Sequence, residues 1–186
     1  MYTIVATHGA IDGVAITFVG DLRYGRTVHS LLRALGLFTN VQVNLVPQYR
    51  LQVPEEVLVP VTEAITANGG TVQTYESLPQ CLPHSDILYV TRIQCERIPT
   101  SIAPPTQEQL HEYCITADYL RTHACKSTLK ILHPLPRVWE ISTDVDSTPH
   151  AVYFDQMRYG LYMRIAILAR IWGLEDCVRN CLKKSN

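Results

Sequence analysis

The stretch VAITFVGDLRYGRTVHSLLRAL, residues 14–35, passes from an extended apolar run, through a polar loop, into a segment with helical spacing. The apolar run 14–20 is rich in β-branched residues and short enough to be a buried strand. Beyond the loop, the apolar side chains between Val28 and Leu35 recur every three or four residues, which is typical of one face of a helix. The stretch therefore predicts a strand–loop–helix unit, from which α/β folds are built.

The same alternation continues along the chain. Further short apolar runs predict strands at 41–47, 71–75, 86–90, 113–116 and 129–133. Between and after them, helical spacing predicts helices at 26–38, 54–70, 116–125 and 151–173, with a kink or a break at Pro60. Strands that alternate with helices predict an α/β fold. We expect a three-layer, doubly wound, mostly parallel sheet flanked by helices, which is Rossmann-like.

The composition restricts the class of protein. With 186 residues, the chain is long enough for a single domain over 1–186 with a sizeable core. Its 16 basic and 17 acidic residues leave a net charge of −1, which gives no indication of a nucleic-acid or membrane partner. No apolar run approaches the ~20 residues of a membrane span, and no basic leader precedes an apolar stretch. We therefore expect a cytoplasmic protein.

The six cysteines form no C-x-x-C pair, which favours reduced thiols over a disulfide framework. Cys177 and Cys181 lie one helical turn apart with no histidine nearby, so packing or surface roles are expected there. The sequence predicts no metal site.

The loop GDLRYGRT, residues 20–27, has the spacing of the phosphate-binding pattern G-x-x-x-x-G-K-[ST], but Arg26 replaces the lysine. Three interpretations are open: a nucleotide site, a site for another anion, or an ordinary strand-to-helix turn. A helix that starts near Arg26 offers free N–H groups to an anion, and arginine suits bidentate capture of a carboxylate. A nucleotide site would also need a magnesium-binding acid after the run 86–90, where the chain has Thr91 and Arg92. The nucleotide interpretation is therefore disfavoured.

Two further loops follow predicted strands, where ligands bind in open α/β sheets. In TRIQCER, Arg92 and Gln94 alternate, so an extended backbone points both to one side, and together they suit a carboxylate. The alternative is a solvated loop in which Glu96 and Arg97 form a surface ion pair.

In HPLPRVWE, residues 133–140, two prolines prevent a helix and leave carbonyl groups unpaired, and a cis X-Pro bond would redirect a carbonyl. His133 is either an acid–base group or a structural histidine with satisfied hydrogen bonds.

Taken together, these loops resemble the aspartate carbamoyltransferase family. The ordered series is GDLRYGRTVHSL, then DILYVTRIQCER, then ILHPLPRVWEISTDVDSTPHAVYFDQMRYGLYMR, and the resemblance extends from Tyr2 to Trp172. Ornithine-specific relatives carry a cysteine in place of Pro134 and lack the TR-x-Q loop, so the aspartate branch fits better. The resemblance implies transfer of a carbamoyl group from carbamoyl phosphate to L-aspartate, an early step of pyrimidine synthesis.

The resemblance also assigns roles to individual residues. Arg26 and Arg92 match arginines that hold the two carboxylates of L-aspartate, and Gln94 matches a glutamine that assists on the side of Arg92. Leu135 and Pro136 match a pair whose backbone carbonyls contact the carbamoyl and amino groups, with the bond between them cis. No side chain of this domain is implied as a catalytic nucleophile, and no cofactor is implied.

Three positions depart from the family pattern. Arg23 and Cys95 stand where lysine is usual, and Trp139 stands where an acid or asparagine is usual. Arg23 keeps its charge, whereas the other two lose polar partners in loops that close over substrate.

Only the aspartate-binding half of such an enzyme is expected in this sequence. The S-T-R-T and H-P-T-Q strings of the family's carbamoyl-phosphate domain do not occur, and residues 1–12 resemble part of the linking helix. We therefore expect a chain that is inactive alone, whose partners are the missing domain and the neighbouring subunits of a homotrimer. The alternatives are a non-catalytic dicarboxylate-binding module and a transcarbamylase for another amino-acid acceptor.

Overall fold

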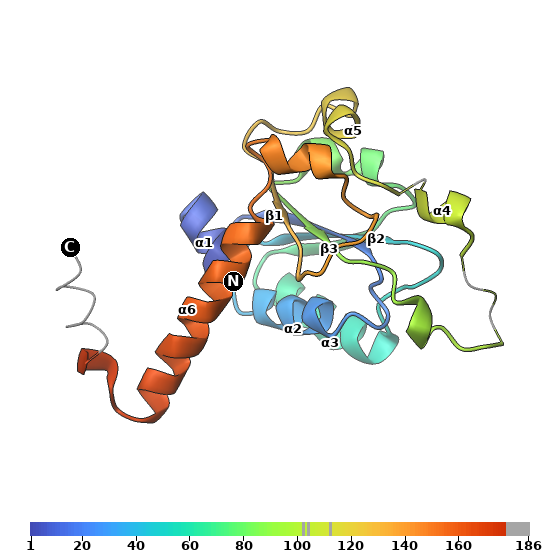
Figure 1. The fold of residues 1–186 in the computed structure, drawn as a ribbon. Coiled ribbons are helices and arrows are strands. Elements are labelled where there is room, and N and C mark those ends of the chain that lie inside the picture. The colour runs from blue at the N-terminus through green and yellow to red at the C-terminus, as the bar shows by residue number, and fades with distance from the viewer. Residues whose placement is uncertain (102, 104, 112, 178–186) are drawn as a thin grey trace.

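The structure, a computed structural model, describes residues 1–101, 103, 105–111 and 113–177. A five-stranded sheet in the order β3-β2-β1-β4-β5 forms its centre, and all four strand pairings are parallel (Figure 1). The strands are β1 (Ala15–Gly20), β2 (Gln42–Pro47), β3 (Thr71–Thr74), β4 (Ile87–Val90) and β5 (Lys130–Leu132). The prediction of a doubly wound parallel sheet is confirmed, because the strand order reverses direction at β1.

Short helices and turns connect the strands. The α-helices are α1 (Tyr2–His8), α2 (Arg26–Leu35), α3 (Glu55–Ala67), α4 (Gln107–His111), α5 (Ala117–Thr122) and α6 (Tyr153–Ile171). The 3₁₀ turns are η1 (Leu78–Gln80), η2 (Leu82–His84), η3 (Cys95–Arg97) and η4 (Thr143–Ser147).

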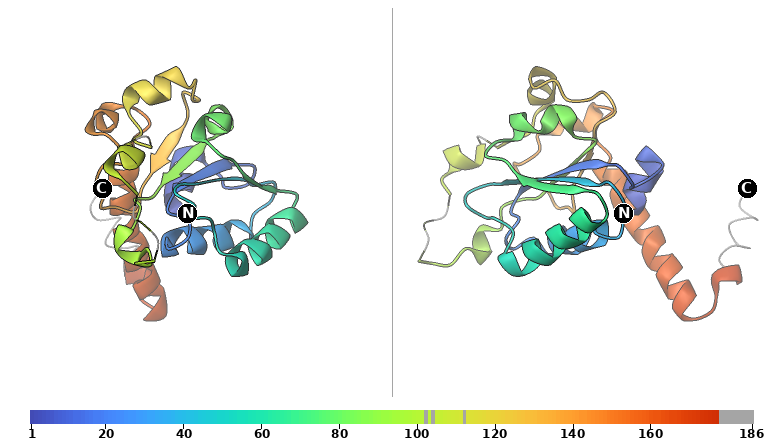
Figure 2. Two further views of the ribbon diagram at one scale, coloured as in Figure 1. Left: turned by 90° about the vertical axis from the view of Figure 1, so that its right-hand side faces the viewer. Right: turned by 180° about the vertical axis from the view of Figure 1, so that it is seen from behind.

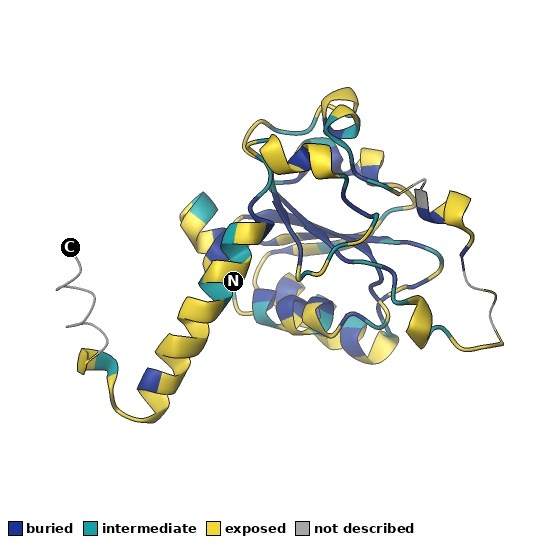
Figure 3. Ribbon diagram, viewed as in Figure 1, coloured by how far each residue is buried: buried dark blue, intermediate teal, exposed yellow. Residues whose placement is uncertain are grey.

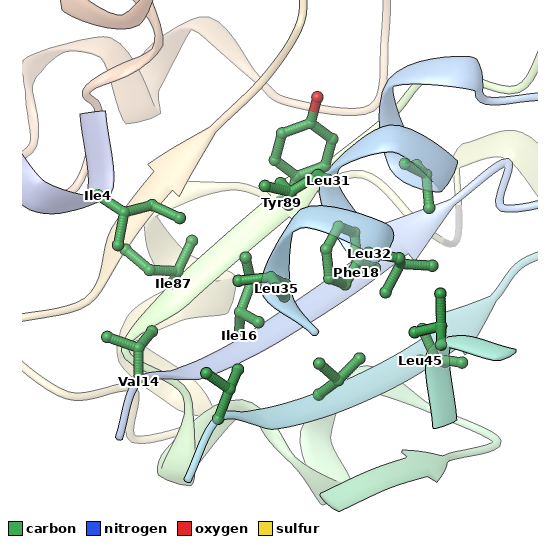
Figure 4. Packing of buried hydrophobic residues seen from close by; sticks show 14 of the residues in the cluster. Ile4, Val14, Ile16, Phe18, Leu31, Leu32, Leu35, Leu45, Ile87 and Tyr89 are labelled. Carbon is green, nitrogen blue, oxygen red and sulfur yellow. The ribbon is translucent and has the colours of Figure 1, made fainter. Parts of the chain in front are cut away.

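The sheet separates two apolar layers, because successive side chains of a strand point to opposite faces. On one face, Ile16 and Phe18 pack with buried side chains of α2 and α3 (Figure 4). On the other face, Val19 packs with buried residues of η1, η2 and α5. The views in Figure 2 show α2 and α3 on one side of the sheet and α5 on the other. This arrangement gives the three layers that the sequence predicts.

The predicted strand at 113–116 is wrong. Ile115 forms only an isolated bridge to Ile141, and the chain then turns at once into α5. The side chain of Thr116 accepts a hydrogen bond from the N–H of Tyr119 at 3.0 Å and so caps this helix. A capped helix start directly after Ile115 leaves no length for a strand.

The predicted break at Pro60 is also absent, because α3 continues through it. Pro60 is exposed, so the carbonyl that lacks its usual N–H partner can bond to water.

Helix α6 leaves the sheet beside α1 and extends away from it (Figure 1). Most of its residues are exposed (Figure 3), including the large apolar side chains of Leu161, Ile165 and Leu168. Even so, no helix in the described part of the chain combines the length and the apolar character that a bilayer crossing requires.

Candidate functional site

The loops 20–26, 91–97 and 133–140 leave β1, β4 and β5, which are neighbours in the sheet. Because these strands are parallel, the three loops start from the same edge. The sheet therefore brings together segments that lie up to about a hundred residues apart in the sequence.

The first loop begins at Gly20, whose φ of 113° suits glycine. A Cβ at this position would lie 2.1 Å from the carbonyl oxygen of Thr91, so glycine allows the exits of β1 and β4 to approach closely. Arg26 then opens α2, after Gly25, which offers no side-chain cap. The Arg26 side chain has neither a hydrogen-bond nor an ion-pair partner within the described residues and is available to a ligand.

In the second loop, the guanidinium of Arg92 donates two hydrogen bonds to Glu96, from Nη2 to Oε1 at 2.5 Å and from Nη1 to Oε2 at 3.3 Å. These contacts lower the pKa of Glu96 below its usual value. The alternative prediction of an ion pair between Glu96 and Arg97 is wrong, since Arg97 instead donates to the carbonyl oxygen of Tyr24 at 3.0 Å. Arg92 is therefore already oriented by an internal carboxylate, with about a third of its side chain exposed.

In the third loop, His133 is buried and both of its ring nitrogens are engaged. Nδ1 accepts the N–H of Leu135 at 2.8 Å, so Nε2 carries the proton and donates to Oε1 of Glu140 at 2.7 Å. The geometry favours the structural interpretation of His133 over an acid–base role.

Glu140 is also buried and accepts the backbone N–H groups of Val138 and Trp139. Burial by itself raises the pKa of Glu140, but the hydrogen bonds from His133 and from backbone N–H groups outweigh it and leave the pKa lowered. The ionised Glu140 thus fixes the course of the loop.

The Leu135–Pro136 bond is cis, as expected. Within the described residues, the carbonyl oxygen of Leu135 accepts no hydrogen bond. Leu135 lines a small cavity that the three loops enclose.

That cavity has a volume of about 230 Å³ and unites the site residues predicted from the sequence. Its lining includes Arg26, Arg92, Gln94, Leu135 and Pro136. Three arginines and one glutamine thus line the same cavity as Leu135 and Pro136, and of the arginines Arg97 donates to the carbonyl oxygen of Tyr24. Such a set can hold a small molecule with two carboxylates and a nitrogen donor.

Comparison with known proteins adds independent information. Residues 12–171 match the family model described as aspartate/ornithine carbamoyltransferase, Asp/Orn binding domain. The chain belongs to the aspartate/ornithine carbamoyltransferase family. Within this family it corresponds to the aspartate-binding half of the aspartate carbamoyltransferase catalytic chain.

Individual relatives agree with this assignment. The chain is 43% identical to the aspartate carbamoyltransferase catalytic subunit of Vibrio cholerae over 174 residues, which is 92% of this chain and 52% of that protein. It resembles the catalytic subunit of aspartate transcarbamoylase from M. jannaschii with a TM-score of 0.78 and 42% identity, over 94% of this chain and 53% of the other. It also resembles a Trypanosoma cruzi aspartate transcarbamoylase in complex with aspartate and phosphate, with a TM-score of 0.77 and 39% identity, over 89% and 49% of the two chains. The chain spans about half the length of these relatives.

One residue that positions the site in this carbamoyltransferase domain was not singled out from the sequence. Asp21 is fully buried, and its Oδ1 accepts the N–H groups of Arg23 at 3.1 Å and Tyr24 at 2.8 Å. Its Oδ2 accepts the N–H of Gln94 at 3.3 Å, so one carboxylate joins the first two loops. Burial raises the pKa of Asp21, although these hydrogen bonds act in the opposite direction. In the sequence, Asp21 directly follows a predicted strand and precedes a turn. That position could have indicated this role, because aspartate side chains often accept backbone N–H groups in turns.

We expect Asp21→Asn to lower the free energy of unfolding by about 1–3 kcal/mol. Either orientation of the amide points an NH₂ group at a backbone N–H that the carboxylate now accepts. Urea unfolding measures the loss, and amide hydrogen exchange at Gln94 and Tyr24 shows which loop is released. Asp118→Asn, which removes an exposed partner of Arg121, is the matched control and should change stability by less than about 0.5 kcal/mol. An Asp21→Asn variant as stable as this control would contradict the role of Asp21.

The positions that depart from the family pattern differ in their surroundings. Trp139 packs against an apolar cluster of Leu51, Ile93 and Leu110, which compensates for the polar contacts expected to be lost there. Cys95 is exposed at the start of η3. Of the cysteine pair near the end of the chain, Cys177 is exposed and Cys181 lies outside the described residues.

Proposed function

We propose that the cavity between the three loops binds L-aspartate. Arg26 and Arg92 each take one carboxylate, and Gln94 donates to the carboxylate on the Arg92 side. The observation that carries this proposal is the meeting of these three residues, from two loops, in one cavity of about 230 Å³. The relative from Trypanosoma cruzi that holds aspartate and phosphate supports the choice of ligand.

The reaction we propose is carbamoyl transfer in de novo pyrimidine biosynthesis. The amine of L-aspartate attacks the carbamoyl carbon of carbamoyl phosphate and forms a C–N bond. The tetrahedral centre then collapses, the C–O bond to phosphate breaks, and the amine loses a proton, which gives N-carbamoyl-L-aspartate and phosphate. The free carbonyl of Leu135 accepts a hydrogen bond from the attacking amine, and the carbonyl of Pro136 contacts the carbamoyl group. The domain contributes position and charge complementarity, with no covalent nucleophile.

The carbamoyl-phosphate half of the site would come from a second domain, and a homotrimer would complete it with a neighbouring subunit. A groove of about 480 Å³ between α1, α2 and α6 supports this part of the proposal. The groove is lined by apolar side chains such as Leu31 and Met157. It is also lined by Leu135, which belongs to the candidate site. We propose that the second domain covers this groove and the exposed apolar side chains of α6, in an enzyme of the cytoplasm.

The alternatives make different predictions. A non-catalytic module would bind a dicarboxylate without turnover in any context. A transcarbamylase for another acceptor would turn over with carbamoyl phosphate and a different amino acid. The two carboxylate-binding groups in one cavity favour aspartate over an acceptor with a single carboxylate, and turnover distinguishes the enzyme from the non-catalytic module.

We expect the purified chain to fold but to show no carbamoyl transfer from carbamoyl phosphate to L-aspartate. Besides the proposed aspartate clamp, the described lining holds one further guanidinium group, that of Arg97, which donates to the carbonyl oxygen of Tyr24 and does not form a phosphate site alone. A colorimetric assay for carbamoyl-aspartate measures this. Turnover by the chain alone that is lost in Arg92→Ala would contradict the expectation.

The proposed function itself is tested by a chimera that carries this chain behind the first half of the Vibrio cholerae relative. Formation of carbamoyl-aspartate by the chimera is the expected result. A folded chimera that uses another amino acid instead would favour the acceptor alternative, and one without turnover on any amino acid would favour the non-catalytic module.

A further inference from the structure

A second, larger cavity lies at the same edge of the sheet, over a different set of strands. It has a volume of about 850 Å³ and is lined by residues that follow β1, β2 and β3, together with residues of the segment 98–113. The candidate aspartate site instead lies over β1, β4 and β5. Tyr24 lines both cavities, but the proposed carbamoyl transfer uses none of the other residues of the larger one.

The charges of this cavity are unbalanced. Arg23 and Arg50 both line it, and neither has an ion-pair partner among the described residues. Glu76 is the one carboxylate in the lining, and it pairs with neither arginine. Two unpaired guanidinium groups favour an anion with several oxygens, and a phosphate group satisfies their planar donor sets better than one carboxylate does.

The walls of the cavity are aromatic. Tyr24, Tyr49, Tyr75 and Tyr113 line it above an apolar floor that includes Leu51. The hydroxyl group of Tyr49 donates to the carbonyl oxygen of Ala103, and that of Tyr75 donates to Oε1 of Gln73 at 2.6 Å. These bonds hold two of the rings in place in the lining of the cavity.

The backbone at the mouth of the cavity is held in an uncommon conformation. Tyr49 and Arg50 have φ values of 48° and 58°, in the left-handed region that residues other than glycine seldom adopt. Two such residues in succession place one ring and one guanidinium group in the same lining. The N–H of Leu51 donates to the carbonyl oxygen of Gln48 at 2.9 Å, so the two residues form the centre of a tight turn that fixes this part of the lining.

We propose that this cavity binds a planar aromatic molecule that carries a phosphate group. The phosphate contacts Arg23 and Arg50, the ring lies against the tyrosines, and Glu76 accepts a hydrogen bond from a donor on the ligand. This site is separate from the aspartate clamp and does not depend on carbamoyl transfer.

The test is isothermal titration calorimetry of the 186-residue chain with 1-naphthyl phosphate, 1-naphthol and inorganic phosphate. We expect 1-naphthyl phosphate to bind saturably and at least about tenfold more tightly than the other two, because only it supplies both ring and anion. Arg23→Gln and Arg50→Gln should each weaken its binding about tenfold. Arg33→Gln, an exposed arginine on α2 outside both cavities, is the matched control and should leave it unchanged.

Two further variants separate the parts of the proposal. Tyr113→Ala should weaken binding of 1-naphthyl phosphate and leave that of inorganic phosphate unchanged. Binding that is abolished by Arg26→Gln and by excess L-aspartate would place the ligand in the aspartate clamp and overturn the proposal. Equal affinity of the wild type, Arg23→Gln and Arg50→Gln would overturn it as well, as would the absence of saturable binding. Because both arginines are exposed, their replacement does not disturb the core.

Discussion

Arg92→Ala should raise the KM for L-aspartate by one to two orders of magnitude, measured in the chimera described above. Arg92 lines the cavity, and its guanidinium group has N–H donors beyond the two that bond to Glu96, so that it can form a charge-assisted pair with a carboxylate of the ligand. Loss of such a charge-assisted pair costs about 1.5–3 kcal/mol, which corresponds to about 10- to 150-fold in affinity. The kcat should change less, because the arginine holds a group that does not react.

Glu96 complicates the interpretation of this variant, since Arg92→Ala also leaves its carboxylate without a partner. The double variant Arg92→Ala, Glu96→Gln removes that charge and should show the same KM as Arg92→Ala alone. Arg121→Ala, on the exposed face of α5, controls for the loss of an arginine elsewhere and should leave the KM unchanged. If Arg92→Ala keeps the KM of the wild type, the assignment of Arg92 to a carboxylate of aspartate is wrong.

Glu140→Ala should have the largest effect on stability, a loss of about 3–5 kcal/mol in the free energy of unfolding. The side chain of Glu140 is buried and accepts three N–H groups, from His133, Val138 and Trp139. Removal of the carboxylate takes the acceptor from all three donors, and the ring N–H of His133 is then buried without a partner. Urea unfolding at neutral pH measures the loss, and Glu63→Ala, on the exposed face of α3, provides the control.

The pH dependence of stability gives a second readout. Because the pKa of Glu140 is lowered on folding, its contribution is present above the ordinary value of 4.5 and is lost as the pH falls through the folded-state pKa. The difference in unfolding free energy between the wild type and Glu140→Gln should therefore shrink below about pH 4.5. A difference that stays constant down to pH 3 would show that the ionised carboxylate is not what stabilises the loop.

Much of the fold could be predicted from the sequence, because β1, β2 and β4 are buried on both faces and are therefore largely apolar runs, whereas β3, at the edge of the sheet, is mostly exposed. The predicted strands at 14–20, 41–47, 71–75 and 86–90 agree with β1 to β4 to within a residue at each end. The run 113–116 has the same composition, but it was wrongly predicted as a strand. Apolar composition cannot distinguish a strand from a short buried connection that ends in a helix cap.

The candidate site could be predicted in part for a related reason. Arg26, Arg92 and Gln94 belong to the connections that follow apolar runs, so the rule for the carboxyl ends of parallel strands applies to them. Asp21 and Glu140 could not be assigned in this way, because most of their partners are backbone N–H groups. The N–H of Gln94 lies 73 residues from Asp21 in the sequence, and no pattern of side chains records such a contact.

The carboxylate of Asp21 has a consequence for binding entropy. When a ligand must order two loops, the conformational entropy that the loops lose makes its binding free energy less favourable. Here the first two loops are joined by one buried side chain and are ordered when the chain folds. The site is preorganised at the base of both loops, so a ligand has less backbone to order and mainly orders side chains such as that of Arg26, which is exposed.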